Sequence, residues 1–98
     1  MNGGISESRW RVVIETLRDL GAAGDILLFG SRAKGGWREG SDIDLAITDA
    51  DKNFRWAAAA KDALEERCFP YSFDVLIIPH IHEEAVLDHI RRVGKKIA

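Results

Sequence analysis

The sequence has a single cysteine, Cys68, among its 98 residues, and a formal net charge of only −2. One thiol cannot form a disulfide within the chain, so a disulfide-stapled scaffold is excluded. No apolar stretch approaches the roughly 18 residues of a membrane-spanning helix, and the amino terminus shows no apolar signal segment, which predicts a cytoplasmic protein. A domain that binds a long nucleic acid usually carries an excess of basic charge, so nucleic acid is not expected as the direct substrate.

Length and composition predict one small globular domain over residues 1–98. Apolar residues at three- and four-residue steps predict a helix over about 6–20, and either Ser6 or Ser8 can cap its start. Asn53 is expected to cap a second helix that runs to about residue 67, and a third helix is expected over about 82–96.

Short apolar runs predict three strands, over 26–29, 43–48 and 71–78. A short helical stretch is expected after the first strand, around residues 32–34. The order of elements predicts an α/β (α+β) fold with a small mixed three-stranded sheet and helices packed on it. If the first two strands are antiparallel neighbours, a helical crossover returns the third strand parallel to the second.

The most informative motif lies between the first two strands. Gly30-Ser31 is followed, after ten residues, by Asp42-Ile43-Asp44, which gives the pattern G-S-x10-D-x-D. The two-residue period of a strand places both aspartates on one face. A further carboxylate, Asp74, is embedded in the third apolar run. Carboxylates in apolar strands are costly to bury unless they are paired or bind metal, so the pattern predicts a magnesium-nucleotide site.

Magnesium prefers hard oxygen ligands and usually retains water and substrate phosphates. Asp42 and Asp44 are therefore expected to share one or two ions. Asp74 is the candidate third ligand, and it can also orient the attacking group or accept its proton. Gly30 lets the backbone approach a phosphate, and the Ser31 hydroxyl with nearby backbone N–H groups is expected to bind phosphate oxygens.

Other side chains near the motif are expected to support the site or have two possible roles. Arg32 and Lys34 are expected to add positive charge beside the phosphates. Ser41 either contacts the site or caps the strand that follows it. Trp37 either packs within the glycine-rich loop or stacks on a nucleotide base.

Through Gly30-Ser31-x10-Asp42-Ile43-Asp44, nearly the whole chain resembles a minimal nucleotidyltransferase of the DNA polymerase β superfamily. The resemblance implies Mg2+-dependent transfer of a nucleoside monophosphate from a nucleoside triphosphate, with ATP expected, to an acceptor, and release of pyrophosphate. It implies that Asp42, Asp44 and Asp74 bind two Mg2+ ions and that Gly30 and Ser31 form the turn that holds the nucleotide phosphates.

Relatives that act on tRNA, polynucleotide ends or aminoglycosides carry extra domains for the acceptor, and this sequence shows none. It therefore resembles the stand-alone antitoxins of HEPN/MNT toxin–antitoxin pairs. That resemblance implies a HEPN-domain partner encoded nearby, which the antitoxin binds and neutralises by adding AMP to a tyrosine. Two alternatives stay open: an antitoxin that acts by contact with nucleotide only stabilising its fold, and a nucleotidyltransferase for small hydroxylated molecules such as aminoglycosides.

Overall fold

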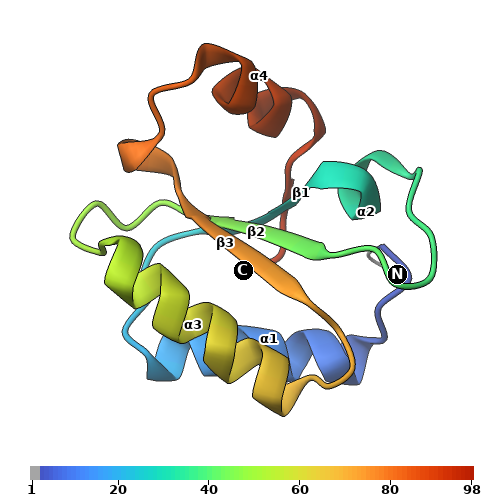
Figure 1. The fold of residues 1–98 in the computed structure, drawn as a ribbon. Coiled ribbons are helices and arrows are strands. Elements are labelled where there is room, and N and C mark those ends of the chain that lie inside the picture. Colours follow the sequence, from blue (N-terminus) through green and yellow to red (C-terminus); the bar gives the residue numbers. More distant parts are fainter. Residues whose placement is uncertain (1–2) are drawn as a thin grey trace.

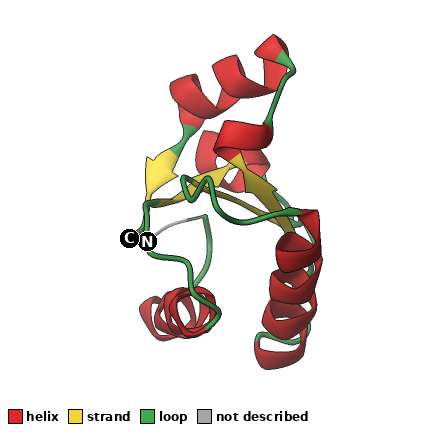
Figure 2. Ribbon diagram, turned by 90° about the vertical axis from the view of Figure 1, so that its left-hand side faces the viewer, coloured by secondary structure: helices red, strands yellow, loops and turns green. Residues whose placement is uncertain are grey.

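The computed structural model describes residues 3–98 as one mixed sheet with helices on both faces (Figures 1 and 2). In chain order, the elements are α1 (Glu7–Asp19), β1 (Ile26–Phe29), α2 (Gly30–Lys34), β2 (Ile43–Ile47), α3 (Phe54–Arg67), β3 (Phe73–Ile77), a 3-10 turn (Ile78–His80), α4 (Glu84–Val93) and β4 (Lys95–Lys96). Over residues 3–98, no helix combines the length and the apolarity that crossing a membrane requires.

The sheet has the strand order β3-β2-β1-β4. β1 runs antiparallel to β2 and to β4, whereas β2 and β3 are parallel. The predicted mixed sheet, with an antiparallel pair followed by a parallel pair, is confirmed. The predicted number of three strands is wrong, because the short strand β4 pairs with β1 as a fourth.

The fourth strand arises where the third helix was predicted to continue. That helix was expected over 82–96, but α4 ends at Val93, and the backbone at Gly94 is extended, with φ −61° and ψ 136°. β4 then pairs with Leu27 and Leu28 of β1. The four-residue step from Val93 to Ile97 imitates one more helical turn, although Ile97 packs against the core from this extended segment instead.

The other helices begin where the sequence predicted. Ser6 caps α1, because its hydroxyl accepts a hydrogen bond of 3.2 Å from the backbone N–H of Arg9. Asn53 caps α3, and its side-chain oxygen accepts one of 2.9 Å from the backbone N–H of Trp56. Each cap satisfies a helix N–H group that has no partner within the helix.

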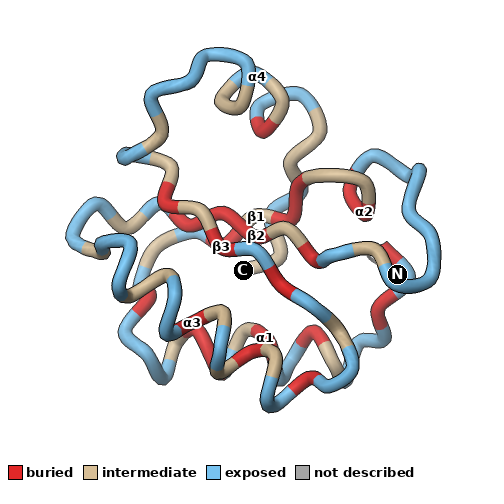
Figure 3. The backbone as a smooth tube through the Cα atoms, in the orientation of Figure 1, coloured by how far each residue is buried: buried red, intermediate tan, exposed pale blue. Residues whose placement is uncertain are grey.

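Most residues of β1, β2 and β3 are buried or partly buried (Figure 3), and their side chains form apolar clusters on both faces of the sheet. One face packs against α1 and α3 and contains the larger core, which includes Val13, Leu17, Ile26, Leu28, Ile43, Leu45, Leu64 and Phe73. The other face carries a smaller cluster of Phe29, Ala46 and Ile90, which brings α4 onto the sheet. Asp44 alternates with Ile43 and Leu45, so its carboxylate lies on the α4 side of the sheet.

Candidate active site

The strand register brings the predicted carboxylates to neighbouring positions. Asp44 of β2 lies opposite Phe29, the last residue of β1, and directly beside Asp74 of β3. Neighbouring strands are about 4.8 Å apart, so these two carboxylates leave the same face at adjacent positions. Asp42 precedes Asp44 by two residues and is exposed at the start of β2. The three predicted carboxylates therefore gather on the α4 side of the sheet.

Asp44 is the electrostatic centre of this group. Partial burial, reinforced by the charges of Asp74 and then Asp42, raises the pKa of Asp44 from 3.8 to about 6. A cation between the carboxylates would favour their charged forms and remove the repulsion. Within residues 3–98, no three acidic, histidine or cysteine side chains converge on one point as they stand. The donor set suits Mg2+, and side-chain rotation would have to complete its coordination.

Gly30 closes the site from the side of β1. Its φ of +70° is a conformation that other residues rarely adopt. A Cβ atom at this position would also overlap with the carboxylate of Asp44. The chain therefore passes directly against the central carboxylate as it turns from β1 into α2. Ser31 follows in the first turn of α2, partly exposed, and its hydroxyl has no hydrogen-bond partner among the described residues.

Arg32 is held by contacts that the sequence did not predict. Its side chain is only 3% exposed and donates hydrogen bonds to the carbonyl oxygens of Gly3 at 2.7 Å and Ser41 at 2.9 and 3.1 Å. The guanidinium also lies over the rings of Trp37 and Tyr71, with its central carbon 5.1 and 5.3 Å from their centroids. Arg32 thus ties together α2, the first described residues and the loop before β2, and its guanidinium is occupied by these carbonyl oxygens.

The loop between α2 and β2 holds the remaining predicted residues. The Ser41 hydroxyl accepts a hydrogen bond of 2.9 Å from the backbone N–H of Arg38, so its side chain closes the loop instead of facing the carboxylates. Trp37 packs on Arg32 and stays 40% exposed. Lys34 is exposed at the end of α2 and remains available to a phosphate.

Sequence reasoning missed a contact that fixes β3 beside the site. Glu65 of α3 accepts hydrogen bonds from Lys61 at 2.6 Å and from the backbone N–H of Phe73 at 2.9 Å. The hydrogen bond from Lys61, and to a smaller extent that from Phe73, lowers the pKa of Glu65 below its ordinary value. Phe73 immediately precedes Asp74, so Glu65 anchors the strand that carries the third carboxylate. Helical periodicity could not reveal this contact, because the contact joins a residue of α3 to the strand that follows the helix.

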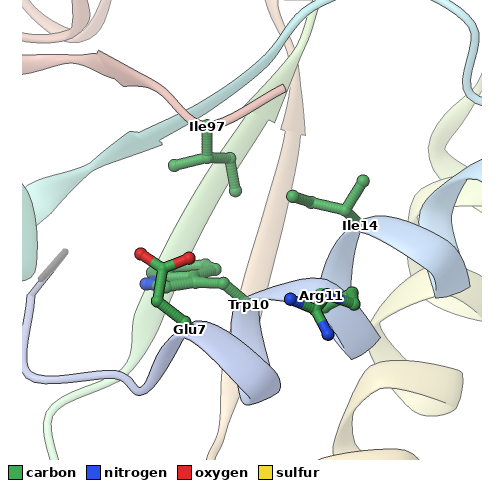
Figure 4. A pocket seen from close by; sticks show the side chains of 5 residues that line it. All are labelled: Glu7, Trp10, Arg11, Ile14 and Ile97. Carbon is green, nitrogen blue, oxygen red and sulfur yellow. The ribbon is translucent and has the colours of Figure 1, made fainter.

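A cavity of about 160 Å³ lies across the sheet from the carboxylates (Figure 4). Glu7, Trp10, Arg11 and Ile14 of α1 line it together with Ile97. The α1 side chains in this view come from the helix that packs on the opposite face of the sheet from Asp44. The cavity is therefore separate from the candidate active site.

A mixed sheet with three neighbouring carboxylates and a glycine turn against the central one is the architecture of a nucleotidyltransferase. The family model described as "Polymerase beta, Nucleotidyltransferase" matches residues 12–98. The chain belongs to the polymerase β nucleotidyltransferase family.

Several solved structures share this fold. A toxin–antitoxin structure with AMP-PNP superimposes with a TM-score of 0.80 at 23% identity, covering 91% of this chain and 72% of that one. A tri-AMPylated HEPN toxin in complex with an MNT antitoxin from Shewanella oneidensis gives 0.76 at 20% identity, covering 96% and 72%. An MntA–HepT toxin–antitoxin structure gives 0.76 at 20% identity, covering 95% and 72%. No curated protein matches this sequence.

Proposed function

We propose that this protein is a Mg2+-dependent nucleotidyltransferase that transfers AMP from ATP to a tyrosine hydroxyl of a HEPN-domain toxin, and thereby acts as its antitoxin. The observation that carries the proposal is the register that sets Asp44 beside Asp74 while Gly30 turns against Asp44. A reaction that consumes ATP and requires Mg2+ also fits the proposed cytoplasmic location.

The donor nucleotide would lie on the β1 side of the site. Gly30 brings the backbone turn directly against Asp44, and Ser31 and Lys34 offer a hydroxyl and a positive charge from α2. Asp42, Asp44 and Asp74 would hold Mg2+, and two ions are proposed by analogy with two-metal sites. Bound there, Mg2+ supplies positive charge that neutralises the phosphates and the departing pyrophosphate.

The acceptor would lie on the β3 side. Its hydroxyl oxygen forms a bond to the α-phosphorus of ATP, and the bond from the α-phosphorus to the bridging oxygen breaks to release pyrophosphate. Asp74 is exposed on β3, where its carboxylate is able to orient the hydroxyl and accept its proton. The remaining carboxylates, Asp42 and Asp44, keep the site negative enough to require bound cations.

The identity of the acceptor comes from the similar structures. Three of them are toxin–antitoxin complexes, one with AMP-PNP and one in which the HEPN toxin is tri-AMPylated. We extend this partnership to the present chain, so that one or more AMP units would be joined to the toxin. A protein acceptor also fits a net charge of −2, which offers no general attraction for nucleic acid.

The test combines the purified protein with Mg2+, α-labelled ATP and the HEPN-domain protein encoded by the adjacent gene. Label and a mass increase of one or more AMP units on the partner are expected with the wild type and with Asp51→Ala, a control in an exposed turn. Both signals should vanish with Asp42→Ala. A tight, neutralising complex without label would favour the contact antitoxin, and transfer only to small hydroxylated molecules would favour the small-molecule nucleotidyltransferase.

A further inference from the structure

We propose that His89 of α4 is a further nucleotide-binding residue, which donates a hydrogen bond to the β- or γ-phosphate of Mg2+–ATP. His89 is partly buried and directly precedes Ile90, which packs on the sheet. The inference rests on the proposed function, because it assigns a contact to the nucleotide that the carboxylates and the glycine turn would hold.

The strand register places His89 on the same face of the sheet as Asp44. Phe29 is the last residue of β1, directly precedes Gly30 and lies opposite Asp44 in the antiparallel pair. Side chains that lie directly opposite one another leave the same face, with their Cβ atoms about 5 Å apart. The imidazole of His89 packs in a T-shaped arrangement against Phe29, with ring centroids 6.2 Å apart. His89 therefore borders the site through Phe29, which is a neighbour of both Asp44 and Gly30.

The phosphates of the proposed nucleotide would lie close to α4. Their proposed contacts include Gly30 and Ser31, at the start of α2. α2 packs against α4, and Figure 1 shows both helices above the strands. A nucleotide held at Asp44 and Ser31 therefore has α4 as its neighbour on that face of the sheet. His89 packs on the strand end that leads into Gly30, so its imidazole is the side chain of α4 that we assign to the phosphates.

The imidazole of His89 has hydrogen-bonding capacity that the fold does not use. Among residues 3–98, neither of its ring nitrogens has a hydrogen-bond or ion-pair partner. An uncharged imidazole carries one N–H donor, and a charged one carries two. Arg32 is occupied by carbonyl oxygens, which leaves Ser31 and Lys34 as the other donors from α2. A triphosphate carries several negative charges, and hydrogen bonds to ionised groups are the stronger kind, so a third donor would add appreciable affinity.

Two variants separate phosphate binding from packing. His89→Phe keeps an aromatic ring against Phe29 and removes the N–H donor, whereas His89→Gln keeps a donor and removes the ring. We expect His89→Phe to raise the Kd for Mg2+–ATP and for Mg2+–pyrophosphate about tenfold, as loss of a hydrogen bond to a charged group commonly does. The Kd for AMP, which lacks the β- and γ-phosphates, should stay within about twofold of wild type.

Isothermal titration calorimetry measures these three constants. His89→Gln should bind Mg2+–pyrophosphate more tightly than His89→Phe does, because its amide can still donate to a phosphate oxygen. His82→Phe makes the same exchange of side chains at an exposed position ahead of α4, and it should match the wild type for all three ligands.

The outcomes distinguish failure of this inference from failure of the proposed function. Wild-type affinity of His89→Phe for Mg2+–pyrophosphate would overturn the contact, while AMP transfer to the partner would still stand. A loss of affinity that extends equally to AMP would assign His89 to packing and overturn it as well. If the wild type binds Mg2+–ATP but modifies no partner, the proposed transfer fails, and a tenfold effect of His89→Phe on pyrophosphate would still support the contact. A wild type that binds neither Mg2+–ATP nor pyrophosphate refutes both.

Discussion

Replacing Asp44 by asparagine should stabilise the metal-free protein while removing a proposed metal ligand. Partial burial and the charges of Asp74 and Asp42 raise the pKa of Asp44 from 3.8 to about 6, so its charged form is disfavoured in the folded state. That rise corresponds to at most about 3 kcal/mol above pH 7. Because the carboxylate is only partly buried, solvent screening reduces the expected gain to about 1–2 kcal/mol. Asparagine keeps the shape of the side chain and lacks the charge.

The pH dependence has a defined sign. A carboxyl group whose pKa is higher in the folded state destabilises the protein when both states are ionised, above pH 6, and has no such effect when both are protonated, below about pH 4. The excess stability of Asp44→Asn should therefore be full near pH 8 and disappear on acidification through this interval. Urea denaturation in EDTA at pH 8, 6 and 4 measures it, with Asp51→Asn as an exposed control.

Addition of Mg2+ should act in the opposite direction. Mg2+ bound by the carboxylates stabilises the folded wild type by an amount that grows with the ratio of the Mg2+ concentration to its Kd. The Asp44→Asn variant has one proposed ligand fewer, so its free energy of unfolding should rise less. The advantage of Asp44→Asn should then shrink or reverse at millimolar Mg2+. A variant that is no more stable than the wild type in EDTA at pH 8 would refute the argument that repulsion among these carboxylates destabilises the empty site.

Two further predictions concern the residues that support the carboxylates. Gly30→Ala should destabilise the fold by on the order of 2–4 kcal/mol and abolish transfer, because a Cβ there overlaps with Asp44. At Gly35 the positive φ is the only obstacle to a side chain, so Gly35→Ala should cost about 1–2 kcal/mol and retain transfer. Denaturation measures the stability of both variants, and AMP incorporation measures their transfer. Glu65→Ala should lower kcat on the order of tenfold, because the backbone of Phe73 would lose its anchor. Glu65→Gln should stay closer to wild type, because its amide oxygen can still accept the hydrogen bond from the Phe73 N–H group. Equal kcat values for the two variants would argue against this anchor.

Local patterns were sufficient to predict most of the fold and the positions of the carboxylates. The caps Ser6 and Asn53, the apolar alternation along the strands and the spacing of Asp42 and Asp44 each act over a few residues, and the structure retains them. The proximity of Asp74 to Asp44 needed one topological step, the parallel return of β3 beside β2, which a helical crossover favours.

The sequence could not reveal contacts that distant segments make only in the folded chain. Arg32 follows the glycine turn as a phosphate-binding residue would, but carbonyl oxygens of Gly3 and Ser41 lie close enough to bind its guanidinium. A buried guanidinium needs such partners, and only the folded chain brings them together. Likewise, β4 exists because Leu27 and Leu28 offer a free strand edge to Lys95–Lys96, which no helical periodicity could reveal.

Asp74 lies on an outer strand of the sheet, on the side from which the proposed protein acceptor would approach. The strand beyond Asp44, β3, is the outermost one on that side of the sheet formed by residues 3–98. Glu65 of α3 anchors the start of this strand, and the exposed Phe54 lies at the start of α3. The proposed partner would therefore supply both the hydroxyl and the missing wall of the site.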